Sequence, residues 1–281
     1  MGKHSRADFD KSVLAHNRRI SLMGEEITVY EVRGAVAMLD VLGLRSQTTP
    51  EFLKLLYYHT YGEKGYLERR DRGVIIPISV DGKLGKARKG ALPPKTAAHT
   101  FQDSLVVYAS GRPPYHRLVE HLMDRLFDPF RDALMDGVFF RGVVSVGTFY
   151  VVGDIIAGPA FYETISWHDR PEWAGVCLTP SAMYSFQQAR HEGASLGSTF
   201  RYSVPLRDGG TLDTWALAWP RHFDRGDLVS IFSEMNILPE VEAKFRNTLA
   251  FYDAVRPQVM KQVEEEEEAA RVARLSPKNR G

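Results

Sequence analysis

The sequence contains very little cysteine and no long apolar run. Its single cysteine, Cys177, has no second thiol to pair with, which excludes an intrachain disulfide and a zinc site built from several cysteines. No apolar stretch approaches the roughly 18 residues that a membrane-crossing helix needs. The polar opening MGKHSRADFD lacks the apolar core of a secretion signal. We therefore expect a cytoplasmic protein that makes no direct membrane contact.

The chain also lacks an excess of either charge. Its 281 residues carry a formal net charge of +1, and 25% of them are charged. A nearly neutral chain is poorly suited to bind nucleic acid through bulk electrostatics, so we expect no nucleic-acid partner. Hydrophobic residues make up 44% of the sequence, which is typical of a globular protein rather than a disordered one. The length fits one large domain, alone or with an appendage.

Hydrophobic periodicity predicts an alternation of strands and helices. The clearest helix is expected over 114–135, where apolar residues form one stripe, and the most strand-like run is 139–151. This order predicts an α+β fold with a ferredoxin-like, antiparallel-containing sheet and helices packed on it. The other expected elements are strands at 26–41, 74–80, 174–179, 200–204 and 214–219, a hairpin over 96–108, a turn at 153–157, and helices at 49–61, at 158–167, from 180 and from 239 onward.

The same pattern divides the chain into four regions. Residues 1–25 are polar and are expected to form a loosely docked arm or a short helix. Residues 26–220 form the main domain, and 221–275 form a C-terminal helical extension. The last residues, 276–281, are expected to be a disordered tail.

An apolar run that ends in one carboxylate is the most informative feature. In the stretch AVAMLDVLGLRSQ (35–47), five apolar residues lead directly to Asp40. A desolvated carboxylate is costly unless it has a counter-charge. A strand end that leads into a helix also binds phosphate well, because free N–H groups point outward there. We interpret Asp40 as a ligand of a divalent cation and the following turn as a phosphate site; the alternative is a buried strand that ends in an N-capping aspartate.

A second carboxylate, Asp103, lies in the predicted hairpin between Phe101 and Leu105. It could point to the same place as Asp40. Two aspartates from adjacent strands can hold two hard cations that keep open positions for phosphate oxygens. The alternative is an ordinary turn residue, a role that aspartate favours.

Three segments together resemble a known family. AMLDVLGLR (37–45), TFQDSLVVY (100–108) and FRGVVSVGTFYVVGDIIAGPAFYET (140–164) are similar to the class III nucleotidyl cyclase catalytic domain. Within that family they look most like the pyrimidine cyclases of bacterial Pycsar anti-phage defence. The resemblance covers about residues 30–185 and extends toward 220, inside the main domain.

The resemblance implies a two-metal site with Mn²⁺ or Mg²⁺. Asp40 and Asp103 would be the metal-binding acids, and Val41 would supply a backbone carbonyl to one metal. Positioning and charge neutralisation would then drive attack of a ribose 3′-oxygen on the α-phosphate, which releases pyrophosphate and a 3′,5′-cyclic nucleotide.

It also implies a phosphate-binding turn directly after the first acid. Leu42, Gly43, Leu44 and Arg45 would wrap the phosphates with main-chain N–H groups. Further along the chain, Arg141 could reach phosphate or pair within the sheet, and we expect the structural role.

The sequence departs from the purine cyclases at the positions that read the base. Tyr162 and Ser166 occupy the places of their asparagine and arginine, and Ala97 falls near the place of the adenine-reading lysine. This favours a pyrimidine substrate or an inactive domain. Tyr162 could stack on a small base and Asp154 could bond its edge; a packed tyrosine and a turn aspartate are the alternatives.

The leading hypothesis is a cyclase that converts UTP to cyclic UMP, with CTP to cyclic CMP as the next choice. The family's head-to-tail dimers imply a homodimer with sites at the interface, and the product would activate a separate effector. The second hypothesis is a nucleotide sensor of the same fold without turnover. The third is a structural or interaction module in which Asp40 and Asp103 are only cap and turn residues.

Overall fold

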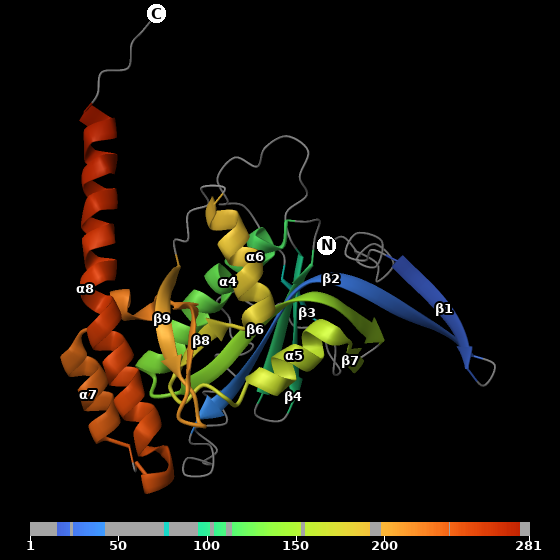
Figure 1. Ribbon diagram of the computed structural model, residues 1–281, viewed down its shortest axis with the longest axis horizontal. Coiled ribbons are helices and arrows are strands. Elements are labelled where there is room, and N and C mark those ends of the chain that lie inside the picture. The colour runs from blue at the N-terminus through green and yellow to red at the C-terminus, as the bar shows by residue number, and fades with distance from the viewer. Residues whose placement is uncertain are drawn as a thin grey trace, which may run out of the picture.

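The computed structural model describes residues 16–22, 25–42, 76–78, 95–101, 104–110, 114–152, 155–191, 198–235 and 237–275. Within these residues the chain forms one large sheet with helices on both sides (Figure 1). The predicted helix over 49–61 lies outside the described residues. No helix in the described part of the chain combines the length and the apolar character that a membrane crossing needs.

The sheet contains ten strands in the described part of the chain. Eight follow one another in the order β3-β4-β5-β2-β6-β8-β10-β9, while β1 pairs with β2 and β7 pairs with β6. All these pairings are antiparallel except β6 with β8. The strands are β1 (His16–Leu22), β2 (Glu25–Leu42), β3 (Ile76–Ile78), β4 (Lys95–Phe101), β5 (Ser104–Ser110), β6 (Phe139–Val152), β7 (Ile155–Ala157), β8 (Gly175–Leu178), β9 (Thr199–Pro205) and β10 (Thr211–Leu217).

Helices connect and cover these strands. A parallel pair of strands needs a crossover, and α5 lies in the connection between β6 and β8. The described helices are α4 (Tyr115–Met135), α5 (Pro159–Trp167), α6 (Pro180–His191), the 3₁₀ helix η1 (Trp219–His222), α7 (Arg225–Ser233) and α8 (Pro239–Leu275). The expected α+β class, with a mostly antiparallel sheet and packed helices, is confirmed.

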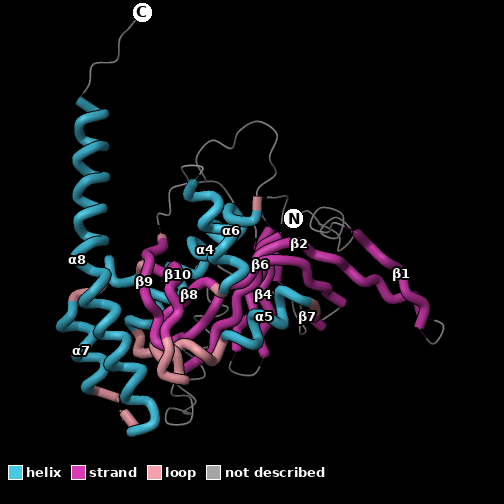
Figure 2. The backbone as a smooth tube through the Cα atoms, in the orientation of Figure 1, coloured by secondary structure: helices cyan, strands magenta, loops and turns pink. Residues whose placement is uncertain are grey.

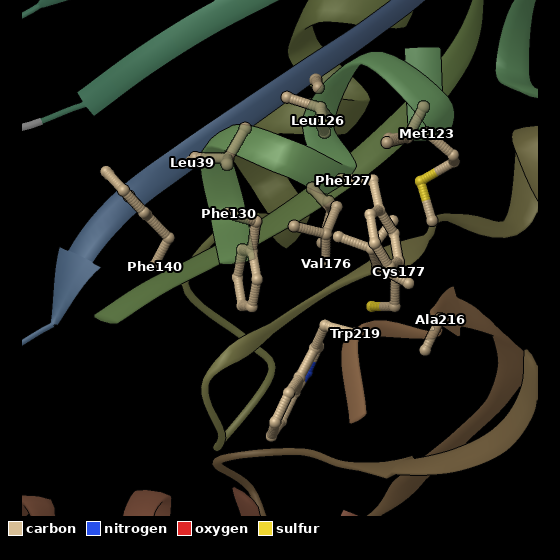
Figure 3. Close-up of a cluster of buried hydrophobic side chains, with 14 of the residues drawn as sticks. Leu39, Met123, Leu126, Phe127, Phe130, Phe140, Val176, Cys177, Ala216 and Trp219 are labelled. Carbon is tan, nitrogen blue, oxygen red and sulfur yellow. The ribbon is translucent and has the colours of Figure 1, made fainter. Parts of the chain in front are cut away.

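The main core lies on the side of the sheet that α4 covers. Side chains alternate between the two faces of a strand, and the odd-numbered residues of β2 from Ala35 to Val41 belong to this core. The predicted apolar stripe of α4 packs against them, with Leu122 and Phe130 among its fully or nearly fully buried members. Figure 3 shows part of this packing, including Cys177, a buried thiol whose pKa is raised to about 12 by burial.

A smaller cluster lies on the opposite face, under α5. Even-numbered residues of β2 and β5 meet odd-numbered residues of β6 there, and Ala160 of α5 packs onto them. A buried hydrogen-bond group fixes the helix to the strand: the Ser145 and Thr164 hydroxyls lie 2.5 Å apart, and both donate to the carbonyl of Ala160. The cluster consists of Val32, Val36, Val106, Tyr108, Phe149, Val151 and Ala160.

The C-terminal helix α8 docks on the main domain through its first half. Phe251 of α8 packs edge-on against Trp173, at 4.4 Å between ring centroids, and Thr248 accepts a hydrogen bond from the backbone N–H of Ala174. The second half of α8 extends beyond the body of the molecule (Figure 2). The boundaries 26–220 and 221–275 stay predictions, but residues of the helical extension belong to the same core as the sheet.

Three local predictions differ from the structure. Residues 16–22 of the predicted arm form a strand, because His16–Leu22 pairs along its whole length with β2, and this pairing outweighs local polarity. The predicted turn at 153–157 includes the short strand Ile155–Ala157, which pairs back onto β6. The last predicted strand ends at Leu217, and the chain turns into η1 at Trp219. Helix α4 runs through Pro129 without dividing.

Candidate functional site

Three neighbouring strands bring polar side chains together at one end of the sheet. The register places Asp40 of β2 directly opposite Ser104 of β5 on one side and opposite Arg141 of β6 on the other. Directly opposed residues share a face of the sheet. Because even-numbered β2 residues such as Val36 belong to the small cluster, this face is the one that α5 covers. The predicted position of Asp40 near the end of a long apolar strand is confirmed.

Both oxygens of the Asp40 carboxylate have partners. The Ser104 hydroxyl donates to Oδ1 at 2.5 Å. Oδ2 lies 3.4 Å from Nε2 of His168 and 3.6 Å from Nη2 of Arg141. The Asp40 side chain is only 16% exposed. The counter-charge that a desolvated carboxylate needs is therefore supplied by side chains of this chain.

Arg141 is the deepest member of this group. Its side chain is 7% exposed, and its Nη1 donates to the carbonyl of Asp169 at 3.0 Å, with a longer contact of 3.5 Å to the carbonyl of Pro171. Burial lowers the pKa of the Arg141 guanidinium, and the nearby Arg207 acts in the same direction while Asp40 opposes it. These contacts hold the guanidinium in place, as its expected structural role requires.

His168 reaches the site from the C-terminal end of α5. Its Nδ1 lies 2.6 Å from the carbonyl of Ile165, which can only accept, so Nδ1 is the donor and Nε2 is the edge that faces Asp40. The buried Ser145–Thr164 contact fixes α5 on β6 and so sets the direction of this ring. The sequence reasoning missed His168. Its place directly after a predicted helix was the available signal, since histidine near a helix C-terminus bonds the last carbonyls.

A second layer of charges surrounds Arg141. Arg207 forms ion pairs with Asp169 at 3.2 Å and with Glu172 at 3.5 Å. Lys244 of α8 is close enough that burial first, and the charge of Arg141 second, lower its pKa. The docked C-terminal helix therefore contributes to the electrostatics of the site.

The other predicted site residues fall into two groups. Val41 and Leu42 are described, and their side chains are buried in the main core, which leaves only their backbone for a ligand. Tyr162 is described on α5 and its side chain is 61% exposed rather than packed. Gly43, Leu44, Arg45, Asp103 and Asp154 lie outside the described residues.

The described residues supply one carboxylate for a metal site. A carboxylate is a suitable ligand for Mg²⁺ or Mn²⁺, and Asp40 is positioned to offer one. Among the residues that the structure describes, no group of three or more His, Cys, Asp or Glu side chains could hold a metal ion. Asp40 can therefore offer one ligand, and a cation there would compete with Arg141 and His168 for Oδ2.

Of three comparisons with known proteins, the one with solved structures gives matches. No protein-family model matches the chain, and no curated protein matches it. Among solved structures, the chain is similar to the catalytic core of a rhodopsin-guanylyl cyclase with converted specificity, in complex with ATPαS. The identity is 12% and the TM-score 0.38, over 67% of this chain and 97% of that one. A likeness at this level does not establish the function of this chain.

Proposed function

We propose that this protein is a metal-dependent nucleotidyl cyclase that converts UTP to 3′,5′-cyclic UMP and pyrophosphate. The observation that carries the proposal is the position of Asp40. It follows the apolar run 35–39 near the end of the central strand β2, and the hydroxyl that bonds it belongs to Ser104, the residue after Asp103 in the sequence. The pairing of Asp40 with Ser104 supports a cation site shared with Asp103, which precedes Ser104 in the sequence.

Mn²⁺ or Mg²⁺ would be held by the carboxylates of Asp40 and Asp103 and by the backbone carbonyl of Val41. When bound, the ions supply charge neutralisation and favour the ionised form of an attacking hydroxyl. The chain's own contribution is positioning. Burial of the Val41 and Leu42 side chains fixes the backbone at the start of the turn that would bind phosphate through main-chain N–H groups up to Arg45.

The base preference rests on α5 and on the absence of the purine-reading residues. Tyr162 is exposed on the same helix that ends at His168, where a small base can stack on it. Asp154 would bond the edge of that base. A pyrimidine fits a site that lacks the purine-reading pair, and we place UTP before CTP.

The biological setting follows the same resemblance. We propose a homodimer in which the two chains complete each other's sites. Its cyclic nucleotide would be a second messenger for a separate effector in anti-phage defence. The exposed apolar side chains Ile155 and Tyr162 near α5 support a partner surface on that face.

One observation favours a second candidate, a nucleotide sensor of the same fold without turnover. Both Asp40 oxygens are engaged by groups of the protein, and two of these groups compete with a cation for Oδ2. A domain that keeps this arrangement would bind a triphosphate without cyclising it.

The test is a four-way incubation of purified protein with ATP, GTP, CTP and UTP, each with Mn²⁺, with products identified by mass spectrometry. We expect a cyclic monophosphate from UTP. A product from CTP alone would change the base assignment, and a cyclic purine would contradict the role given to α5. UTP binding without any product would establish the sensor.

A further inference from the structure

Two basic side chains occupy the oxygen of Asp40 that a cation would need. Oδ2 faces His168 Nε2 at 3.4 Å and Arg141 Nη2 at 3.6 Å, while Oδ1 bonds the Ser104 hydroxyl. We infer that this arrangement is a closed, metal-free state of the site, and that His168 must leave Asp40 before a divalent cation binds there. The inference rests on the proposed function, because it assigns a regulatory contact to the same carboxylate.

The two partners of Oδ2 are held very differently. Arg141 projects from β6, a central strand of the sheet. Its guanidinium is fixed by the backbone carbonyls of Asp169 and Pro171, and only 7% of its side chain is exposed. His168 has 20% of its side chain exposed, and one 2.6 Å contact to Ile165 holds its other nitrogen. His168 is therefore the partner that can move, and Arg141 stays.

The way α5 is attached supports this division. The buried contacts of α5 involve Ala160 and Thr164, near its start and middle. Beyond them, Ile165 and Ser166 are exposed, and His168 follows as the C-cap. Trp167 in this last turn packs against the main core, so the turn itself is anchored, and His168 leaves Asp40 by a side-chain rotation that breaks its contact with Ile165.

The consequence for metal binding follows from competition. If only the fraction of molecules with His168 displaced can accept a cation at Oδ2, the apparent Kd is raised in inverse proportion to that fraction. Removing the His168 side chain removes the partner that can move and leaves Arg141 as the remaining partner of Oδ2. Binding should then become tighter even when no nucleotide is present.

The experiment measures Mn²⁺ binding by electron paramagnetic resonance of the free ion, at one pH and without nucleotide. We expect His168→Ala to bind Mn²⁺ about threefold to tenfold more tightly than the wild type, which is the scale of one net polar contact. Arg170→Ala is the matched control. It removes a positive charge two residues away, which pairs with Asp208 at 4.0 Å, and should leave Mn²⁺ affinity within about twofold.

The double variant Asp40→Asn, His168→Ala ties the gain to Asp40, because it should lose the tight binding. Unchanged affinity in His168→Ala would overturn the inference. Weaker affinity would overturn it too, since it would make His168 a ligand rather than a competitor. If His168→Ala does not give a wild-type circular dichroism spectrum, His168→Phe, which keeps a ring but no nitrogen, serves in its place with the same expected gain.

These outcomes separate the inference from the proposed function. Tighter Mn²⁺ binding by His168→Ala, with no cyclic product from any of the four triphosphates, would keep the closed state and remove the cyclase. A cyclic product from the wild type, with equal Mn²⁺ affinity in both proteins, would keep the cyclase and remove the closed state.

Discussion

The two faces of the sheet differ in how they are covered. On the α4 side, four helices and the 3₁₀ turn bury one continuous core that reaches from β5 to α8. On the α5 side, a helix of nine residues covers a cluster of seven buried residues. The same strands serve both faces, so the contrast comes from the helices and not from the sheet.

The sparsely covered face is the one that carries the charged site. Asp40, Ser104 and Arg141 stand at the end of that face, where α5 ends at His168. Burying such charges costs free energy unless each is paired. The large core on the other side supplies the stability, which leaves the α5 side free to hold groups that favour chemistry or binding over packing.

The largest expected effect is a loss of activity without a loss of fold, at Asp40. Asp40→Asn should abolish cyclisation, because the amide keeps the shape of the side chain but loses the charge that holds a cation. The fold should persist, since Arg141 retains its carbonyl acceptors. Mass spectrometry of the UTP reaction and circular dichroism check the two parts. Turnover at the wild-type rate would show that Asp40 is not a metal ligand.

On the α4 side, Phe130→Ala should give the largest loss of stability. Phe130 is 2% exposed and lies between the sheet and Trp219, whose ring centroid is 6.2 Å away. Removing a buried phenyl ring costs about 3–5 kcal/mol of the free energy of unfolding. Urea denaturation measures this loss. A loss in free energy of unfolding below about 1 kcal/mol would mean that the core around Phe130 is far less closely packed than in the structure.

Two adjacent valines of β5 offer a direct comparison of the faces. Val107 is 4% exposed and points into the main core, and Val106 is 3% exposed and points into the small cluster. Val107→Ala should cost about 2 kcal/mol and Val106→Ala about 1 kcal/mol, because a thin layer can collapse around the lost methyl groups. Urea denaturation of both variants makes the comparison. Equal costs, or the reverse order, would contradict the difference between the faces.

The smallest effect concerns Glu120 on α4. Burial, and then the charge of Asp124, raise the pKa of Glu120 to about 7, and its Oε1 is buried without a hydrogen-bond partner. Because the folded-state pKa lies above the unfolded value of 4.5, the folded state binds the extra proton, and stability falls as pH rises from about 4.5 to about 7.

Glu120→Gln removes this loss. The variant should be more stable than the wild type by about 1 kcal/mol at about pH 8, a value reduced for the half-exposed position of the side chain. At about pH 4 the two proteins should match. Urea denaturation at both pH values provides the measurement, and a pH-independent difference would exclude Glu120 as the source.

Sequence periodicity was enough to predict the elements that carry this comparison. Local patterns predict the apolar stripe of α4, the strand β6 and the position of Asp40 near the end of β2. The need of Asp40 for a counter-charge was also predictable, because a desolvated carboxylate always has one. Which group supplies it was not, since a metal ion and a guanidinium satisfy the same requirement.

The parts that escaped prediction depend on non-local pairing. Arg141 lies 101 residues after Asp40 (141 minus 40), and only the register of β2 with β6 makes them neighbours. His168 reaches the site through the packing of α5 on β6, which no local pattern encodes. The strand His16–Leu22 likewise exists because β2 extends far enough to pair with it.

The strands β2 and β6 are neighbours in the sheet but lie far apart in the sequence, and this has a consequence for how the protein is synthesised. During translation β2, which ends at Leu42, emerges early, but its central neighbour β6 begins only at Phe139 and the histidine of the site follows at residue 168. At about 5–20 residues per second, a ribosome needs on the order of ten seconds to synthesise that interval. For this time an 18-residue strand, with its apolar run at 35–39, has no β6 to pair with, and unpaired strand edges recruit other chains. The nascent chain is therefore most vulnerable to aggregation just before its site can assemble.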